Sequence, residues 1–308
     1  MDKNSRVPES RVLLLQGGGA LGAYQAGVFE AMDRAGLQPD WVVGTSIGAI
    51  NAAIIAGNPP PRRLEHLFEF WSRVGQDWTK TRLDSPTLDP VAAAWMSQWN
   101  AIITMAFGVD GFFRPRWGSS FAFGLPVAPG EAAHYDVAPL ARTLEALVDF
   151  DYLSRSAVRL SVGAVDVQRG QIRYFDSREE PIGVQHILAS SALPPAFAPG
   201  ESDGRHYWDG GIYSNTPLER VLRDDPCKDI LCFLATLWPV QDVLPESLRN
   251  VLRRRKEIQF ASRADTVLEL EQEIYQLRRD VALLAARLPA SALDDEDIRK
   301  SVERGCRR

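Results

Sequence analysis

A serine between two glycines is the residue of this chain best suited to act as a nucleophile. Residues 44–48 have the sequence G-T-S-I-G and match G-x-S-x-G, the strand-turn-helix elbow that holds a serine Oγ clear of its surroundings. Two valines end a short apolar run before the motif, and small apolar residues follow it at helical spacing. Gly44 and Gly48 leave the room that the tight turn needs. We therefore predict that Ser46 attacks a carbonyl carbon.

A second glycine-rich turn offers donors for the oxyanion that forms when a serine attacks a carbonyl. Gly17, Gly18 and Gly19 follow an apolar run at residues 11–16 and precede apolar residues at helical spacing. Three glycines leave backbone N–H groups bare and let a substrate oxygen approach closely. Loops after neighbouring parallel strands meet at the carboxyl edge of a sheet, so we expect this turn and Ser46 to face one pocket.

The same glycines allow a second interpretation, a nucleotide-binding module. Gly17, Gly19 and Gly22 fit G-x-G-x-x-G directly after a strand and at the start of a helix, which is the fingerprint of dinucleotide-binding turns. An acid that binds ribose belongs at the carboxyl end of the second strand. Asp40 instead precedes that strand, and Ser46 follows it. This order favours a hydrolase and keeps the nucleotide-binding module as the alternative.

A serine needs a base to take its proton, and the sequence offers two candidates close together. Asp209 is followed by Gly210 and Gly211, a pattern that most often marks a turn but that also presents a carboxylate from a loop. A carboxylate that acts directly as the base needs burial to raise its basicity. His206 lies three residues before Asp209, and a Ser-His-Asp esterase with this ring as the base is the alternative.

Apolar runs and helical patterns alternate along the first part of the chain. We expect strands at residues 11–16, 41–43, 158–167, 171–175 and 230–236, and helices that include residues 47–56, 137–147 and 183–192. Strand-helix-strand order of this kind predicts an α/β fold with a central, mostly parallel sheet and right-handed crossovers.

The composition limits the classes of fold and partner. The 308 residues are 45% hydrophobic and carry a net charge of -5, which suits a large core and lacks the basic footprint of a nucleic-acid-binding protein. We expect a catalytic domain at residues 1–245, with an aromatic-rich helical insertion at about residues 77–130, and a helical extension at residues 246–308. The aromatic residues of the insertion either pack on the core or contact an acyl chain or lipid surface.

The extension contains a helix with apolar residues at near-heptad spacing. Within residues 266–288 these are Val267, Leu270, Ile274, Leu277, Val281, Leu284 and Leu288. Such a face must pack on something, either the domain itself or a second subunit, so a homo-oligomer through this helix is one of two expectations.

The sequence also bears on compartment and metal content. No apolar run reaches the length of about 18 residues that a membrane span needs, and the polar first residues do not resemble a secretory signal. Cys227, Cys232 and Cys306 fit no metal-ligand spacing. We expect a cytoplasmic protein without a bound metal.

Four blocks, taken in order, resemble the patatin-like phospholipase family. They are Gly17–Gly22, Gly44–Gly48, Ala189–Pro194 and Asp209–Gly211, within residues 11–237. The resemblance implies a three-layer α/β/α fold and a Ser-Asp dyad without histidine. It makes Ser46 the acyl-accepting nucleophile and Asp209 its base. The implied oxyanion hole is Gly17, Gly18 and Gly19, with Gly22, Gly44, Gly48, Gly210 and Gly211 supporting these motifs.

The resemblance also implies a substrate class. Similar proteins cleave acyl esters of phospholipids or neutral lipids, some transfer acyl groups, and none of this chemistry needs a metal or another cofactor. A lipid ester substrate and peripheral contact with the inner membrane follow as expectations. One position departs from the family: Leu21 stands where many members have Arg or Lys. A cation there would help to anchor a phosphate, so a preference for phospholipids over other lipid esters does not follow for this chain.

Overall fold

The computed structural model describes residues 10–79, 108–116, 124–224, 230–289 and 295–306. The chain divides into two compact units, one of Met1–Pro217 with Ile230–Leu237 and one of Leu218–Asp229 with Trp238–Arg308. The first unit contains every residue that the sequence assigns to the candidate site. The functional division expected at residue 245 stays a prediction.

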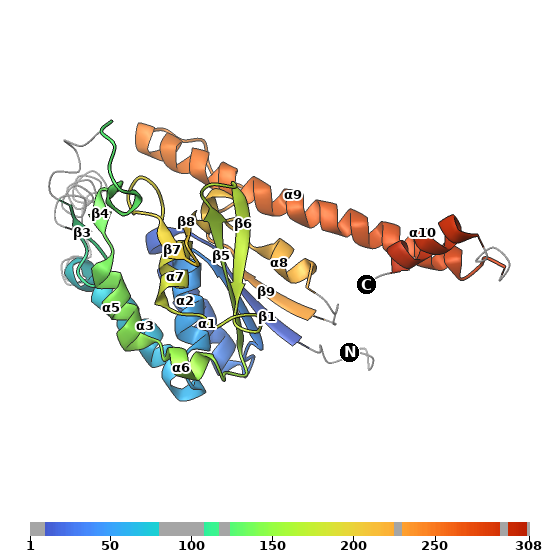
Figure 1. The fold of residues 1–308 in the computed structure, drawn as a ribbon, viewed down its shortest axis with the longest axis horizontal. Coiled ribbons are helices and arrows are strands. Elements are labelled where there is room, and N and C mark those ends of the chain that lie inside the picture. Colours follow the sequence, from blue (N-terminus) through green and yellow to red (C-terminus); the bar gives the residue numbers. More distant parts are fainter. Residues whose placement is uncertain (1–9, 80–107, 117–123, 225–229, 290–294, 307–308) are drawn as a thin grey trace. The chain divides into compact units, whose positions relative to one another are not determined.

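A seven-stranded mixed sheet forms the centre of the first unit, with the strand order β7-β8-β5-β2-β1-β9 and β6 paired with β5 (Figure 1). The strands are β1 (Ser10–Leu15), β2 (Trp41–Thr45), β5 (Arg159–Asp166), β6 (Gln171–Asp176), β7 (Gly200–Ser202), β8 (Arg205–Asp209) and β9 (Ile230–Ala235). β9, β1, β2 and β5 run parallel, and β6, β7 and β8 pair antiparallel. The predicted α/β fold with a central, largely parallel sheet is confirmed.

Helices of the first unit follow the strands as the sequence predicts. They are α1 (Ala23–Arg34), α2 (Ile47–Ala56), α3 (Pro60–Thr79), α5 (Ala138–Leu147), α6 (Phe150–Leu153) and α7 (Val184–Ser190), with the short 3-10 helices η1 (Gly19–Gly22), η2 (Pro129–Glu131) and η3 (Gly210–Ile212). The strand at β7 and the strand at β8 were not predicted, because each is short and lacks a long apolar run.

The helix that follows Ser46 is the centre of the core. All ten residues of α2 are buried, because the helix packs on β1, β2 and β5 and also meets α1, α3, α5 and α7. A helix that is apolar all round is expected to be buried in this way. Its burial fixes the start of α2, and therefore the turn at Ser46, relative to the sheet.

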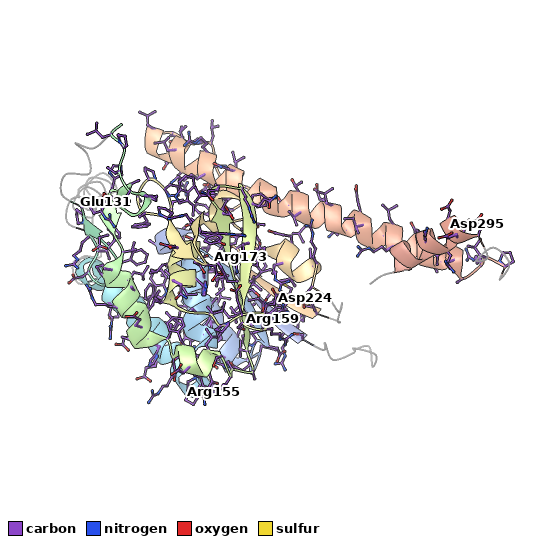
Figure 2. All side chains as sticks on the ribbon, viewed as in Figure 1. Glu131, Arg155, Arg159, Arg173, Asp224 and Asp295 are labelled. Atoms are coloured by element: carbon purple, nitrogen blue, oxygen red, sulfur yellow. The ribbon has the colours of Figure 1, made fainter. Side chains whose placement is uncertain are left out.

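Two arginines on the sheet strands, both labelled in Figure 2, form ion pairs with carboxylates. On β5, Arg159 forms a buried ion pair with Asp176 at 2.9 Å. On β6, Arg173 reaches Glu180 at 3.1 Å and donates to the hydroxyl of Tyr207 at 2.9 Å. These contacts join β5, β6 and β8, the strands beside the candidate site.

The expected aromatic insertion lies largely outside the described residues. Of its described part, β3 (Arg114–Pro115) pairs with β4 (Tyr135–Asp136). The ring of Phe113 contacts Tyr135 and Phe197 with centroids 4.7 and 5.7 Å apart, and Phe112 contacts Phe70 of α3. These two aromatic residues therefore pack within the fold.

The second unit is helical. It contains α8 (Leu218–Leu222), the 38-residue α9 (Leu248–Ala285) and α10 (Glu296–Cys306). α9 packs with α8 and α10, and Phe260 stacks on Trp238 with ring centroids 5.0 Å apart. Within the described residues, no helix combines the length and apolar character needed to cross a bilayer.

Candidate active site

Ser46 occupies the strained turn that the elbow motif predicts. It joins β2 to α2 with φ 57 and ψ -126, a backbone conformation that non-glycine residues rarely adopt and that tends to mark functional positions. A Cβ built on Gly44 would lie 2.3 Å from the carbonyl oxygen of Gly48, and one on Gly48 would lie 2.2 Å from that of Leu15. Side chains at either glycine would push the turn apart.

Asp209 meets Ser46 directly. The Ser46 Oγ donates a hydrogen bond of 2.6 Å to Oδ2 of Asp209, although 163 residues separate them. The other carboxylate oxygen accepts the N–H of Gly211 at 2.7 Å. Asp209 is buried while Ser46 is only half-buried, so the hydroxyl faces the surface and the carboxylate lies behind it.

The sheet register explains why these two side chains meet. Consecutive residues of β5, Gly163 and Ala164, pair with Thr45 at the end of β2 and with Asp209 at the end of β8. β2 runs parallel to β5 and β8 antiparallel to it. The two strands therefore approach each other end to end along the same edge of β5. The residue after β2 is Ser46, which places the hydroxyl beside the last residue of β8.

Burial makes the Asp209 carboxylate more basic. Loss of hydration raises the pKa of Asp209 to about 6, and the hydrogen bonds from Ser46 and Gly211 lower it only in part. The charged form of a buried carboxyl is disfavoured when no cation offsets the lost water. At neutral pH the group is still ionised and binds a proton more readily than an ordinary aspartate.

Two serines at the end of α7 hold the backbone of Ser46. The N–H of Ser46 donates to Ser190 Oγ at 3.1 Å, and Ser190 Oγ donates to the carbonyl of Gly163 at 2.7 Å. The Ser191 Oγ donates to the carbonyl of Ser46 at 3.2 Å. The sequence placed both serines in the block Ala189–Pro194 without giving them a role. Fixed backbone contacts of this kind hold the strained turn in place.

The glycine turn lies beside the elbow. A Cβ on Gly17 would be 3.1 Å from the Cβ of Ser46. Asn215 holds this turn from both sides: its Nδ2 donates to the Gly17 carbonyl at 2.9 Å, and the Gly17 N–H donates to its carbonyl at 3.2 Å. The sequence motifs do not point to Asn215, because pattern alone does not reveal a contact across 198 residues.

The remaining motif glycines also lie in close contacts. An added Cβ would lie 2.5 Å from Ile47 at Gly22, 2.2 Å from the Gly163 carbonyl oxygen at Gly210, and 2.8 Å from Asn215 Oδ1 at Gly211. Real Cβ atoms do not approach other atoms this closely. Gly210 therefore needs glycine, because its neighbour is backbone, whereas a side chain at Gly22 or Gly211 would displace Ile47 or Asn215.

The alternative base and the alternative nucleotide site are not assembled. His206 lies three residues before Asp209 on β8, and side chains alternate between the faces of a strand, so its ring and the Asp209 carboxylate project to opposite faces. Ser46 reaches Asp209 without an intervening ring. Asp40 accepts the N–H of Arg11 at 2.8 Å, at the end of the sheet away from the glycine turn.

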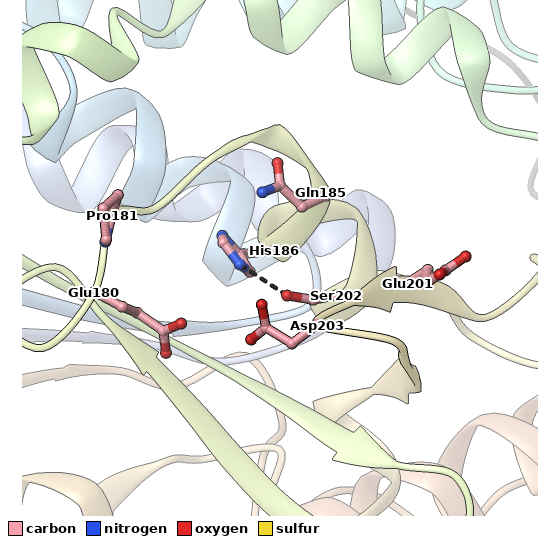
Figure 3. A pocket seen from close by; sticks show the side chains of 7 residues that line it. All are labelled: Glu180, Pro181, Gln185, His186, Glu201, Ser202 and Asp203. Carbon is pink, nitrogen blue, oxygen red and sulfur yellow. Dashed lines mark hydrogen bonds between the residues drawn. The ribbon is translucent and has the colours of Figure 1, made fainter.

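A separate hollow lies near the start of α7, and neither Ser46, Asp209 nor the motif glycines line it (Figure 3). It has a volume of about 690 Å³ and is lined by Glu180, Pro181, Gln185, His186, Glu201, Ser202 and Asp203. His186 Nδ1 accepts the N–H of Gly183 at 2.9 Å, so the proton of the neutral ring is on Nε2, which faces Ser202 Oγ at 3.1 Å. Burial lowers the pKa of His186. The ring is a donor to Ser202 and does not activate it.

The fold and the site define an α/β protein with a serine on a nucleophile elbow and a buried carboxylate in contact with it. The chain belongs to the patatin-like phospholipase family, whose model matches residues 13–222. A second model, described as patatin phospholipase, matches residues 258–308. The expected family is thereby confirmed.

Curated relatives carry phospholipase names. The chain is 26% identical to the cGAMP-activated phospholipase of Escherichia coli (strain TW11681) over 247 residues, or 70% of this chain and 57% of the relative. It is 25% identical to that of Vibrio cholerae over 269 residues, or 78% of this chain and 63% of the relative. The chain thus spans less than two thirds of the length of these relatives.

Solved structures similar to this chain include two bacterial proteins. VipD from Legionella pneumophila has a TM-score of 0.38 and 16% identity, with 74% of this chain and 50% of that chain covered. Full-length ExoU in complex with SpcU, from Pseudomonas aeruginosa, has a TM-score of 0.34 and 17% identity, with 97% of this chain and 68% of that chain covered.

Proposed function

We propose that this chain is a serine lipid acyl hydrolase that cleaves carboxylic ester bonds of phospholipids or other lipid esters. Ser46 is the nucleophile and Asp209 the base. The observation that carries the proposal is the 2.6 Å hydrogen bond from Ser46 Oγ to a buried carboxylate. Covalent catalysis by a serine needs such contact between the nucleophile and a base, and burial raises the pKa of this carboxyl to about 6. Membership of the patatin-like phospholipase family supports the lipid substrate.

In the first half of the reaction the enzyme is acylated. Ser46 Oγ forms a bond to the ester carbonyl carbon while its proton passes to Asp209 Oδ2, and the carbonyl oxygen becomes an oxyanion. The tetrahedral intermediate then expels the alcohol, whose oxygen takes the proton from Asp209. The products of this half are the free alcohol and an ester between the acyl group and Ser46.

In the second half the acyl group is released. Water gives a proton to Asp209 and bonds to the acyl carbon, and collapse of the second intermediate returns that proton to Ser46 Oγ as the fatty acid leaves. If an alcohol replaces water, the same steps transfer the acyl group. The pKa of about 6 suits Asp209 to both roles, because it is ionised at neutral pH and holds a proton long enough to pass it on.

The oxyanion hole that we propose differs in one residue from the sequence expectation. The Gly17 N–H is already used by the carbonyl of Asn215, so Gly18 and Gly19 are the donors. They stand at the cap and first position of η1, where N–H groups have no partner within the helix. Because the C=O and N–H of a trans peptide point in opposite directions, the Asn215 bond to the Gly17 carbonyl fixes the direction of the Gly18 N–H.

Peripheral contact with a lipid surface is part of the proposal. Exposed apolar side chains stand on the segments that follow the site residues: Leu21 and Tyr24 after the glycine turn, Leu193 after Ser191, and Ile212 and Tyr213 after Asp209. A group of exposed apolar residues around a site marks a binding surface. With Leu21 exposed at 47%, hydrophobic contact replaces the cation that many members carry there.

Labelling with a fluorophosphonate, followed by identification of the modified peptide, tests the nucleophile. The native chain should be labelled at Ser46 and should hydrolyse a chromogenic fatty ester. Ser46→Ala should lose both properties, and Asp209→Asn should lose at least about 100-fold in hydrolysis, the usual scale of a general base. Ser202→Ala is the matched control, since it removes a serine that faces His186, and it should keep both. Label on another residue, or full hydrolysis by either dyad variant, would refute the assignment.

A titration separates the hydrolase from the nucleotide-binding alternative. The protein is mixed with NAD or ATP and binding is followed at equilibrium. We expect no saturable binding that depends on Gly17–Gly22. Tight binding together with absence of esterase activity would favour the nucleotide-binding module.

A further inference from the structure

Helix α9 changes character along its length. In its first part Glu257 and Ala261 are buried, Arg254 bonds to Glu257 at 3.3 Å, and Phe260 stacks on Trp238. From Asp265 to Pro289 none of the residues whose burial is described is buried. α10 packs on α9, yet apolar side chains of this second part, Leu277 and Leu284 among them, stay exposed. A helix whose apolar face remains in water is only marginally stable.

The apolar residues of this second part follow a strict heptad. The spacing between successive members alternates between three and four residues over three heptads, with a positions at Val267, Ile274, Val281 and Leu288 and d positions at Leu270, Leu277 and Leu284. Leu277 and Leu284 are exposed at 64% and 63%. We call these seven residues the α9 seam. A seam that keeps the 3.5-residue repeat over several turns is the signature of a coiled coil.

The types of residue select one kind of coiled coil. The first three a positions are β-branched, and every d position is leucine. β-branched residues at a with leucine at d favour two parallel strands over three or four. We propose that the α9 seam pairs with the α9 seam of a second copy of this chain in a parallel two-stranded coiled coil.

Charges beside the seam fit the same arrangement. Glu273 is at a g position and Arg278 at the e position five residues later. In a parallel pair the g residue of one helix faces the e residue of the next heptad of its partner. Two symmetric Glu-Arg ion pairs then flank Ile274 and Leu277 at the middle of the seam. Both charged side chains are exposed in the single chain, which leaves them accessible to a partner helix.

Sedimentation equilibrium of the full chain tests the pairing. The native protein should approach twice the chain mass of 34.2 kDa as its concentration rises. Leu277→Lys puts a charge at the centre of the seam and should weaken association at least about tenfold. Leu283→Lys is the matched control: Leu283 is exposed at 50% on the same helix but lies at a c position, away from the seam, and the variant should associate like the native chain.

A charge exchange tests the parallel register. Glu273→Arg and Arg278→Glu should each weaken association, since each places like charges at the g-e′ contact, and the double variant should restore it. In an antiparallel pair these two positions do not face each other, so failure of the double variant to recover would refute the parallel arrangement.

Other occupants of the seam give different results. A native chain that stays at 34.2 kDa at every concentration, and whose thermal stability falls with Leu277→Lys, would show that the seam packs within one chain. A monomer that binds phosphatidylglycerol vesicles through the seam would show a lipid contact. Either result overturns the proposal. Because mass is the measurement, the outcome does not depend on whether Ser46 is a nucleophile.

Discussion

The central sheet holds two serine-aspartate hydrogen bonds of almost equal length, with different surroundings. Ser46 donates to Asp209 at 2.6 Å, and Ser161 donates to Asp176 at 2.5 Å. Both carboxylates are buried. Asp176 also receives the guanidinium of Arg159 at 2.9 Å, whereas the Asp209 carboxylate has Ser46 and the Gly211 N–H as its partners among the hydrogen bonds of the described residues.

The two carboxyls differ in pKa because Arg159 lies beside Asp176 and no such ion pair is described for Asp209. Burial alone would raise the pKa of Asp176, but hydrogen bonds from Arg159, Ser161 and the Arg178 N–H more than offset this and hold it below the ordinary value. Burial raises the pKa of Asp209 to about 6. A serine proton can therefore pass to Asp209 but not readily to Asp176. The hydrogen bond between a serine and an aspartate is therefore not by itself a sign of catalysis.

The largest effect on stability is expected at the pair that holds a cation. Asp176→Asn removes the carboxylate that pairs with Arg159, whose side chain is 5% exposed, and removing one partner of a buried ion pair costs about 3–5 kcal/mol of unfolding free energy. The folded fraction should still hydrolyse a fatty ester, because Asp209 is intact. Urea denaturation at pH 8 measures the loss. Asp203→Asn, at a side chain 65% exposed, is the control and should change stability by less than about 1 kcal/mol.

The parts of the site that the sequence predicts are the turns formed by residues close together in the chain. The elbow at Ser46 and the turn at Gly17–Gly19 need glycines at fixed offsets from a strand and a helix, so a pattern identifies them. The contact between Ser46 and Asp209 depends instead on where β2 and β8 end along β5. That register is long-range, and β8 itself was not predicted because its five residues, R-H-Y-W-D, alternate too little. The hydrogen bond from the Gly17 N–H to the Asn215 carbonyl likewise joins segments that are distant in the chain, so the sequence does not reveal it.

The second prediction removes the charge from the pair without a cation. The folded pKa of Asp209 is above the value of 3.8 for a free group. Folding therefore takes up a proton between these pH values, and stability falls as the pH rises from 3.8 to about 6. Above about pH 6, the ionised Asp209 lowers the free energy of unfolding by up to about 3 kcal/mol. Asp209→Asn should thus be more stable than the native chain at pH 8, while it loses hydrolysis.

The test is the difference between two urea midpoints at pH 8, with the native chain as reference. A destabilised Asp209→Asn variant would mean that Asp209, like Asp176, is held by favourable partners, and the contrast between the pairs would be lost. Circular dichroism of the variant checks that its fold is unchanged.

The third prediction compares the removal of each serine hydroxyl. Ser161 is buried, accepts the indole N–H of Trp41 at 2.8 Å and donates to Asp176, so Ser161→Ala removes both hydrogen bonds and should cost about 1–3 kcal/mol of stability. Its rate of ester hydrolysis should stay within about twofold of the native rate, because the change does not touch Asp209. Ser46→Ala should instead lose ester hydrolysis and keep its stability. Fluorophosphonate labelling of a Ser161→Ala chain should therefore proceed normally, and loss of labelling would mean that the two pairs are coupled.

The smallest effect, about tenfold in kcat/KM for each pH unit below about 6, is the one that identifies the base. In the proposed mechanism only the ionised Asp209 accepts the Ser46 proton. Because burial raises the pKa of this carboxyl to about 6, kcat/KM should fall steadily below that pH. Over the same interval the contribution of Asp209 to stability improves as the pH falls. The loss of activity is then not unfolding caused by this group, and circular dichroism should stay constant between pH 7 and pH 5. If kcat/KM stayed constant down to pH 5, Asp209 would not be the base. Loss of this acidic limb in His206→Ala would instead assign the base to that ring.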